Sequence, residues 1–307
     1  MRRAKILIDC DPGHDDAVAI LYAARHCELL GITTVHGNQT IEHTTRNALA
    51  LLEIAGIDVP VARGCARPLL AEPVVGAYMH GETGLDGADL PPPQREPIAL
   101  HAVDFIIETA RAYQGELVLA VIGPQTNVAM ALRREPRLSG WLREITIMGG
   151  STDRGNVTPA AEFNIHIDPE AASVVYDCGA PVRMVGLNVT RHVGVSEHDI
   201  GQLKSSRRRV ARACAGFLEF YLGRQRAAGR HHAVMHDVCA IVPHVDDGLI
   251  DYHDAHVAIE LAGTHTRGMT VCDFRVGAER KPNAKVAVDA RGEKLMAGVM
   301  EALSSYD

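Results

Sequence analysis

Four aspartates lie within eight positions near the start of the chain, directly after an apolar run. They are Asp9, Asp11, Asp15 and Asp16 in the stretch "KILIDCDPGHDDAVAI", residues 5–20. Carboxylates this close together repel, and a buried one is costly unless something positive compensates it. An acidic first helical turn with an Asp as its N-cap accounts for one or two of them. The convergence of several at a strand end favours a hard cation with oxygen ligands, Ca²⁺ or Mg²⁺.

The same stretch also permits a different chemistry, that of an aspartyl-phosphate phosphatase. In that class the first Asp of a DxD pair is a nucleophile and the second is an acid. The motif expects Thr or Val and then an apolar residue soon after the second Asp, whereas this chain has "DPGHDD". A lysine near a later strand end is also expected, and the sequence offers no convincing one. On this stretch alone the alternative stays open.

Three further polar clusters come later in the chain. "HDVCA" at 236–240 places His236 beside Asp237, "AEFN" at 161–164 places Glu162 two positions before Asn164, and "HGETG" begins at His80. Taken singly, the first is typical of a helix N-cap at Asp237. The second is typical of a polar loop, whose two side chains lie on one side if it is extended, and the third of a mobile Gly-rich loop. Their positions relative to the predicted strands make a functional role more favoured than these structural ones.

Short apolar runs alternate with helical patterns over the first 190 residues. The runs "KILID", "LLGITTV", "VPVA", "ELVLAVIG", "EITIMGG" and "PVRMVGLNV" predict strands covered on both faces. Helices are predicted at about 15–26, 40–55, 98–113, 126–134 and 168–178, then at 196–228, 237–242 and 291–304, with strands in "HVAIELAG", "GMTVCDFRV" and "AKVAVDA". This order predicts an α/β fold, a doubly wound, mostly parallel sheet with a Rossmann-like core, in one domain spanning 1–307.

Two segments interrupt this alternation of strands and helices: residues 64–97 and residues 150–163. The first contains "HGETGLDGADLPPPQREP", which is too rich in Gly and Pro for regular structure, and a loop of that length is usually functional or mobile. The polar clusters fall at the carboxyl ends of the predicted strands. Ligands of open α/β sheets bind there, so we expect one pocket.

Composition limits the class of protein. The chain of 307 residues is 47% hydrophobic, only 4% aromatic, and carries a formal net charge of −7. These values argue against nucleic acid or an anionic membrane as a partner. The seven cysteines are scattered without a CxxC pair, and no apolar stretch resembles a signal peptide or a membrane span. We therefore expect a cytoplasmic protein.

Together the motifs resemble the inosine-uridine-preferring nucleoside hydrolase family. The matching stretches are "DCDPGHDDAVAI", "HGNQT", "HGETGLDGADLP", "GPQTNVA", "IMGG", "GNVTPAAEFNIHIDPEAA", "MHDVCA" and "GMTVCDF". They occur in order over nearly the whole chain, from residue 5 to about 289. Within the family, "HGETGLDGADLP", "GNVTPAAEFN" and "KPNAKVAVD" are most similar to the pyrimidine-preferring ribonucleoside hydrolases.

The resemblance implies a role for individual residues. A Ca²⁺ ion would be held by Asp11, Asp16, Asp237 and the main-chain carbonyl of Thr126, with Asp11 as general base on the bound water. His80 and His236 would lie near the base as recognition groups or proton donors. The remaining substrate contacts, to the ribose hydroxyls and the 5′ end, would come from Asp15, Asn38, Met148, Asn156, Glu162, Asn164, His236 and Asp237.

The sequence also departs from the family pattern. Some members place an aromatic residue shortly before the His-Asp pair, but "AAGRHHAVMHD" has none, which leaves base preference and the roles of His231 and His232 open. We predict a Ca²⁺-dependent hydrolase of pyrimidine nucleosides acting in salvage, with a homodimer or homotetramer implied by the resemblance. The rivals are an inosine-uridine or purine-preferring hydrolase, the phosphatase, and a non-catalytic nucleoside-binding protein.

Overall fold

The computed structural model describes residues 3–307, which are built around a nine-stranded sheet. Its strand order is β10-β9-β11-β6-β5-β4-β1-β2-β3, and every pair from β11 to β3 is parallel, whereas β9 runs antiparallel to both of its neighbours. The strands are β1 (Lys5–Cys10), β2 (Glu28–Thr34), β3 (Val61–Arg63), β4 (Leu117–Val121), β5 (Glu144–Met148), β6 (Val182–Val185), β9 (Ile250–Ile259), β10 (Thr270–Asp273) and β11 (Ala284–Ala290). The predicted doubly wound, mostly parallel α/β fold is confirmed.

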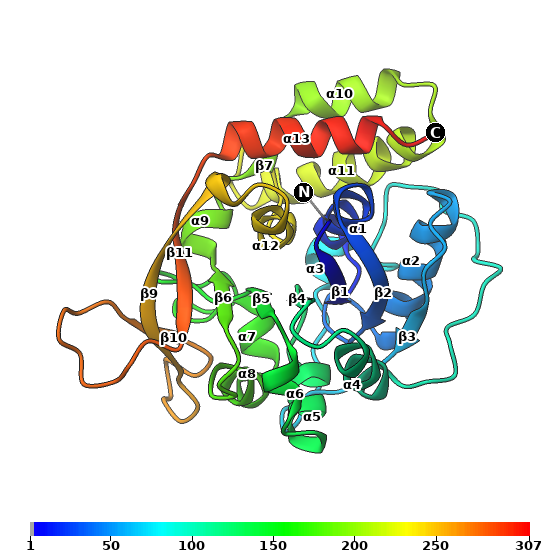
Figure 1. Ribbon diagram of the computed structural model, residues 1–307. Helices are drawn as coiled ribbons and strands as arrows, with labels where there is room; N and C mark the ends of the chain where they lie inside the picture. Colours follow the sequence, from blue (N-terminus) through cyan, green and yellow to red (C-terminus); the bar gives the residue numbers. More distant parts are fainter. Residues whose placement is uncertain (1–2) are drawn as a thin grey trace.

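Helices cover both faces of the sheet (Figure 1). Buried residues of β1 alternate between the two layers: Ile6 and Ile8 pack with α1, α2, α11, α12 and α13, and Leu7 packs with α4, α5 and α8. This explains why the predicted strands are apolar throughout rather than alternating. The helices are α1 (His14–His26), α2 (Ile41–Ile54), α4 (Ala102–Ala112), α5 (Thr126–Arg134), α6 (Leu138–Trp141), α8 (Pro169–Tyr176), α11 (Arg209–Ala227), α12 (Val238–Ile241) and α13 (Gly292–Ser304).

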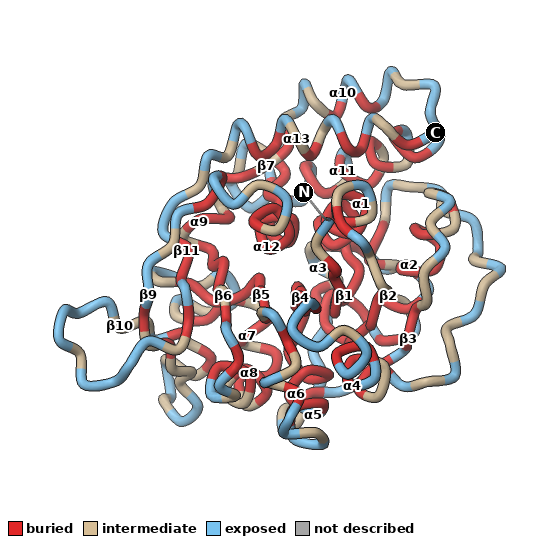
Figure 2. The backbone as a smooth tube through the Cα atoms, viewed as in Figure 1, coloured by how far each residue is buried: buried red, intermediate tan, exposed pale blue. Residues whose placement is uncertain are grey.

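The remaining elements are short or lie at the periphery. They are α3 (Ala77–His80), α7 (Phe163–Ile167), α9 (Leu187–Thr190), α10 (Glu197–Ser205), the two-residue strands β7 (Gly194–Val195) and β8 (Ala233–Val234), and two turns of 3₁₀ helix at Val242–His244 and Asp247–Leu249. Figure 2 shows that β1, β4 and α12 are buried along their lengths, whereas the segment after β3 is largely exposed. Among the described residues, no helix is long and apolar enough to cross a membrane.

Four predicted elements differ from the structure. The strand predicted over 256–263 spans Ile250–Ile259 instead. The single helix predicted at 196–228 is two helices, α10 and α11, because Ser206 and Arg208 adopt extended backbone and let α11 fold back against α10. The strand predicted over 181–189 ends at Val185, and the chain continues as the short helix α9. "AEFN" is not extended, because Glu162 is the N-cap of helix α7.

Candidate active site

The site lies where the strand order of the sheet reverses direction. From β1 the chain winds outward to β2 and β3, and from β4 it winds the other way to β5 and β6. The crossover helices leave a crevice outside the carboxyl ends of β1 and β4, which is where ligands of such sheets bind. A cavity of about 670 Å³ opens at this position.

The loop after β1 is held by its own acidic side chains. Asp16, in the first turn of α1, accepts the main-chain N–H groups of Asp11 (3.2 Å) and Gly13 (2.9 Å), so it caps its own helix. Asp11 accepts the main-chain N–H of Asn38 at 2.6 Å through Oδ2, while its Oδ1 is buried without a partner. The acidic first turn is therefore present, but the N-cap residue is Gly13 rather than the expected aspartate, and this hydrogen bonding accounts for Asp16 alone.

Two glycines let neighbouring loops approach Asp11 closely. A β-carbon on Gly37 would lie 2.1 Å from Asp11 Oδ2, and one on Gly123 would lie 2.6 Å from Oδ1. The loops after β2 and β4 therefore touch this carboxylate from two sides. Any larger side chain at either position would displace it.

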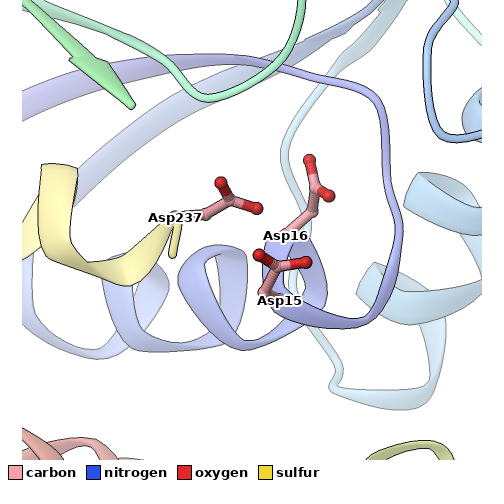
Figure 3. Close-up of side chains that lie close together, drawn as sticks. All are labelled: Asp15, Asp16 and Asp237. Atoms are coloured by element: carbon pink, nitrogen blue, oxygen red, sulfur yellow. The ribbon is translucent and has the colours of Figure 1, made fainter. Parts of the chain in front are cut away.

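Three carboxylates converge beside Asp11. Asp15, Asp16 and Asp237 each offer an oxygen, and these atoms lie within 4.8 Å of one another. Figure 3 shows Asp15 and Asp16 at the start of α1 and Asp237 at the start of α12. Although Asp237 is the N-cap residue of α12, its side chain makes no capping hydrogen bond, so it is available to a ligand.

The electrostatics of this cluster are unfavourable without a cation. Burial and repulsion by neighbouring carboxylates raise the pKa of Asp15 to about 8 and the pKa values of Asp11 and Asp237 well above the ordinary range, and burial raises the pKa of Asp16 to about 6 despite its hydrogen bonds. Nearby positive charge reverses both effects. The chemistry of the donors, all carboxylate oxygens, suits a hard divalent ion.

Asp9 is buried beneath the cluster and serves the scaffold. It accepts hydrogen bonds from Thr33 Oγ1 (2.5 Å) and Asn127 Nδ2 (2.8 Å), which tie β1 to β2 and to α5. Burial raises its pKa to about 7. It does not line the cavity.

Two asparagines of the cavity wall use their amide NH₂ groups to bond the protein, which leaves their amide oxygens for a ligand. Asn38 Nδ2 donates to the Asp11 carbonyl (3.2 Å) and to Asp16 (3.0 Å), and Asn164 Nδ2 donates to the carbonyls of Ile122 (2.9 Å) and Met148 (3.1 Å). Because each NH₂ group is committed to the protein, the Oδ1 atom is left as the acceptor for a ligand. Both residues line the cavity.

Glu162 connects two walls of the cavity. Its carboxylate accepts main-chain N–H groups from Gly150 (2.9 Å), Asn164 (3.0 Å) and Ile165 (3.2 Å), which joins the end of β5 to the start of α7. Burial raises its pKa to about 7 despite these bonds. Its position at the cavity wall follows from this capping geometry.

Thr126 begins α5 at the carboxyl end of β4. Its hydroxyl donates to Asp168 at 2.7 Å, and Asp168 also accepts the N–H of Leu69 and caps α8 through Ala171. The residue is 1% exposed and does not line the cavity. Thr126 follows Gly123 by three residues, and Gly123 packs against Asp11. The turn at 123–126 therefore lies next to the acidic cluster.

Both predicted histidines line the cavity, and both are buried. His236 Nδ1 lies 2.7 Å from Thr190 Oγ1, and His80 Nδ1 lies 3.0 Å from His14 Nδ1. Burial lowers the pKa of His236 to about 3 and that of His80 well below its usual value. Near neutral pH both rings are therefore uncharged.

The structure brings most of the predicted site residues to the one cavity. Those lining it are Asp15, Asn38, His80, Met148, Asn156, Glu162, Asn164, His236 and Asp237; Asp11, Asp16 and Thr126 do not line it. His231 and His232 are also absent from its walls. Which of these residues bind a metal or a substrate remains a prediction.

The sequence analysis missed several residues that line the cavity. Tyr221 and Gln225 project from α11, and Tyr78 comes from the segment after β3. Arg154, Arg191 and Arg230 also line it. Tyr221 thus brings an aromatic ring to the cavity from α11, about fifteen residues before the His-Asp pair, and a search for rings at helical spacing in 209–227 would have found it.

Comparison with known proteins decides the family. A family profile described as "Inosine-uridine preferring nucleoside hydrolase" matches residues 6–297. The chain belongs to this family. The prediction of a ribonucleoside hydrolase is confirmed at this level.

Relatives match over nearly their whole length. The pyrimidine-specific ribonucleoside hydrolase RihA of Enterobacter sp. is 39% identical, and that of Salmonella arizonae is 40% identical, each over 98% of both chains. Among solved structures, a purine-preferring ribonucleoside hydrolase from Gardnerella vaginalis superposes with a TM-score of 0.93 at 31% identity, covering 98% of each chain. A plant nucleoside hydrolase, the PpNRh1 enzyme, gives 0.92 at 33%, covering 99% of each.

Proposed function

We propose that this nucleoside hydrolase cleaves the N-ribosidic bond of pyrimidine ribonucleosides with the help of Ca²⁺, releasing ribose and a free base. The observation that carries the proposal is the convergence of Asp15, Asp16 and Asp237 beside Asp11, which has an unpartnered oxygen, with Asp15 and Asp237 lining the cavity. The substrate class rests on the pyrimidine-specific relatives.

The residues fit a hard divalent cation. Asp11, Asp16, Asp237 and the carbonyl of Thr126 would hold it, since the first three are buried carboxylates whose charge needs compensation. A Ca²⁺ ion there lowers the pKa of a bound water and binds neighbouring hydroxyl groups. The unpartnered Asp11 Oδ1 is the oxygen with capacity left for such a ligand.

Asp11 is the general base of the proposal. Its Oδ2 is fixed by the Asn38 N–H and its Oδ1 is free, so one oxygen orients the carboxylate and the other takes a proton from water. The packing of Gly37 and Gly123 against it prevents the carboxylate from turning away. Positioning of this kind contributes to the rate together with proton transfer.

The walls suit a sugar that becomes positively charged. Cleavage of an N-ribosidic bond passes through an oxocarbenium-like ribose, and the amide oxygens of Asn38 and Asn164 direct negative dipoles toward such a charge. Asp15 and Glu162 add carboxylate oxygens as acceptors for the ribose hydroxyls. We assign Asn156 and Met148 to the 5′ end.

His80 and His236 complete the proposal at the leaving base. The departing pyrimidine gains hydrogen bonds or a proton, and both histidines line the same cavity as neutral rings. Each is therefore a hydrogen-bonding partner of the base rather than a resident cation. We extend the proposal to nucleoside salvage in the cytoplasm by a homodimer or homotetramer.

The test is a comparison of uridine, cytidine and inosine as substrates of the purified enzyme with Ca²⁺. We expect free base and reducing sugar in equal amounts, with uridine or cytidine cleaved fastest. Inosine as the best substrate would overturn the pyrimidine preference, and release of phosphate from phosphomonoesters without nucleoside cleavage would overturn the whole proposal.

A further inference from the structure

His14 contacts the proposed leaving-group residue His80 although it does not line the cavity. It is the first residue of α1 and is fully buried. Its Nδ1 lies 3.0 Å from His80 Nδ1, and its Nε2 lies 3.0 Å from the main-chain oxygen of Asp86. Both of its ring nitrogens are therefore engaged.

The carbonyl of Asp86 determines where the protons lie. A carbonyl oxygen only accepts, so His14 Nε2 must carry a proton, and a neutral His14 then has a lone pair on Nδ1. His80 Nδ1 must in turn donate its proton to that lone pair. His80 is left with an unprotonated Nε2, which has no protein partner among the described residues.

The opposite arrangement is less favourable. The main-chain N–H of His14 also points at His80 Nδ1, at 3.3 Å, and it has no acceptor there when Nδ1 carries the proton. If His80 Nδ1 accepted this longer bond, His14 would need protons on both nitrogens. That would create a buried imidazolium beside a second histidine, and no carboxylate oxygen is among the hydrogen-bond partners of either described ring.

Aromatic packing holds the two rings in this geometry. His14 stacks on Tyr221 (5.1 Å between centroids, 10° between planes) and on Phe220 (5.5 Å, 18°), and His80 stacks on the same Tyr221 (5.3 Å, 22°). The segment carrying His80 is a single helical turn flanked by Gly76 and Gly81. Contacts with α1 and α11 therefore orient a histidine whose own segment has little structure.

We infer that His14 is a positioning residue that accepts the Nδ1 proton of His80 and so presents the unprotonated His80 Nε2 to the base in the cavity. This rests on the proposed function. A lone pair at that position accepts an N–H of the base, such as N3–H of uracil or the amino group of cytosine.

Two variants separate the hydrogen bond from the packing. His14→Phe keeps an aromatic ring against Tyr221 but has no acceptor for His80. His14→Asn loses the ring but places an amide oxygen near the position of Nδ1. Each is assayed with uridine and with p-nitrophenyl riboside, whose leaving group departs as a stable anion and needs no help from the protein.

We expect His14→Phe to lose at least about tenfold in kcat/KM on uridine, because the N3–H of the base loses its acceptor, and much less on p-nitrophenyl riboside, whose leaving group has no such N–H. His14→Asn should retain more uridine activity than His14→Phe. Equal losses on both substrates would overturn the inference, since they would mean that the first turn of α1 is disturbed. An unchanged His14→Phe would also overturn it.

A second readout is independent of activity. In protein labelled with ¹⁵N-histidine, the ring shifts of His80, assigned by their disappearance in His80→Ala, should report a proton on Nδ1 in the wild type and a shift toward Nε2–H in His14→Phe. An Nε2–H tautomer in the wild type would overturn the inference. If the wild type cleaves neither riboside, the proposed function fails, while the tautomer measurement still decides the role of His14.

Discussion

The acidic residues of the first loop divide by what each side chain contacts. Asp9 accepts hydrogen bonds from Thr33 and Asn127, and Asp16 caps α1 through the N–H groups of Asp11 and Gly13. Asp9 and Asp11 each have one hydrogen-bonded oxygen and one buried oxygen without a partner, but it is the Asp11 carboxylate against which the loops at Gly37 and Gly123 pack. At the scale of residues, these contacts separate structural from chemical carboxylates within the same sequence motif.

The first prediction tests this separation. Asp11→Asn should lower kcat on uridine by about 10²-fold or more, because the amide takes no proton from water. Asp9→Asn is the matched control, since Asp9 lies two residues earlier, near the end of β1, and is equally buried. Its effect should appear in the free energy of unfolding, measured in urea, rather than in kcat. Equal kcat losses in both variants would contradict the assignment of Asp11.

At the scale of elements, Asp168 ties three segments to the site. It is the N-cap of α8, it accepts the hydroxyl of Thr126 at the start of α5, and it accepts the N–H of Leu69 in the segment after β3. The turn at Thr126, whose carbonyl is proposed to bind the cation, is therefore held in place by Asp168, a residue that does not line the cavity.

The second prediction concerns this anchor. Asp168→Ala should lower the free energy of unfolding by about 2–4 kcal/mol, because a helix cap and two further buried hydrogen bonds are lost together. Asp246→Ala is the control: it removes a half-buried N-cap that bonds Gly248 and pairs with the exposed Lys294 at 3.4 Å, and should cost about 1 kcal/mol or less. Urea titrations of both variants measure the difference. If both variants lose a similar free energy of unfolding, the two further hydrogen bonds of Asp168 do not add to the stability of the fold.

At the scale of the whole molecule, a buried cluster of carboxylates makes stability depend on a cation. The described loops that meet at Asp11 come from α1, β2 and β4, so one ion between them would join both halves of the sheet. A ligand that binds only the folded state stabilises it by mass action.

The third prediction is that chelation lowers the thermal midpoint and that Ca²⁺ restores it. At a Ca²⁺ concentration about 100-fold above Kd, the gain should be about 2.7 kcal/mol. Asp237→Asn should abolish the Ca²⁺-induced shift, and it removes no helix cap because this side chain makes no capping bond. Asp58→Asn, an exposed acid paired with Arg95, should keep the full shift. A wild type insensitive to Ca²⁺ would contradict the proposed site.

The fourth prediction concerns how stability depends on pH through His244, a histidine buried away from the acidic cluster. Burial lowers the pKa of His244 to about 3, with Arg183 and Arg143 adding to the effect. Between about pH 6.5 and pH 3 the unfolded chain thus binds a proton that the folded chain does not, so stability falls as the pH falls and is unaffected above this range.

His244→Gln should reduce this acid-side slope by up to about 1.4 kcal/mol per pH unit, measured from urea midpoints between pH 6 and pH 4. His265→Gln, at an exposed position, should leave the slope unchanged. An unaltered slope in His244→Gln would mean that this ring is protonated in the folded protein.

The sequence by itself determined the strands and the chemical class of the site, because apolar runs report burial on both faces and carboxylates after a strand report a charged strand end. Tertiary structure alone decided the rest. The break between α10 and α11 accompanies the folding of α11 back against α10, and Tyr221 reaches the cavity from an α11 that also packs on α1 and α3. The proton on His80 depends on a contact between positions 66 residues apart. Local sequence carries no record of such contacts, since they arise when the chain closes on itself.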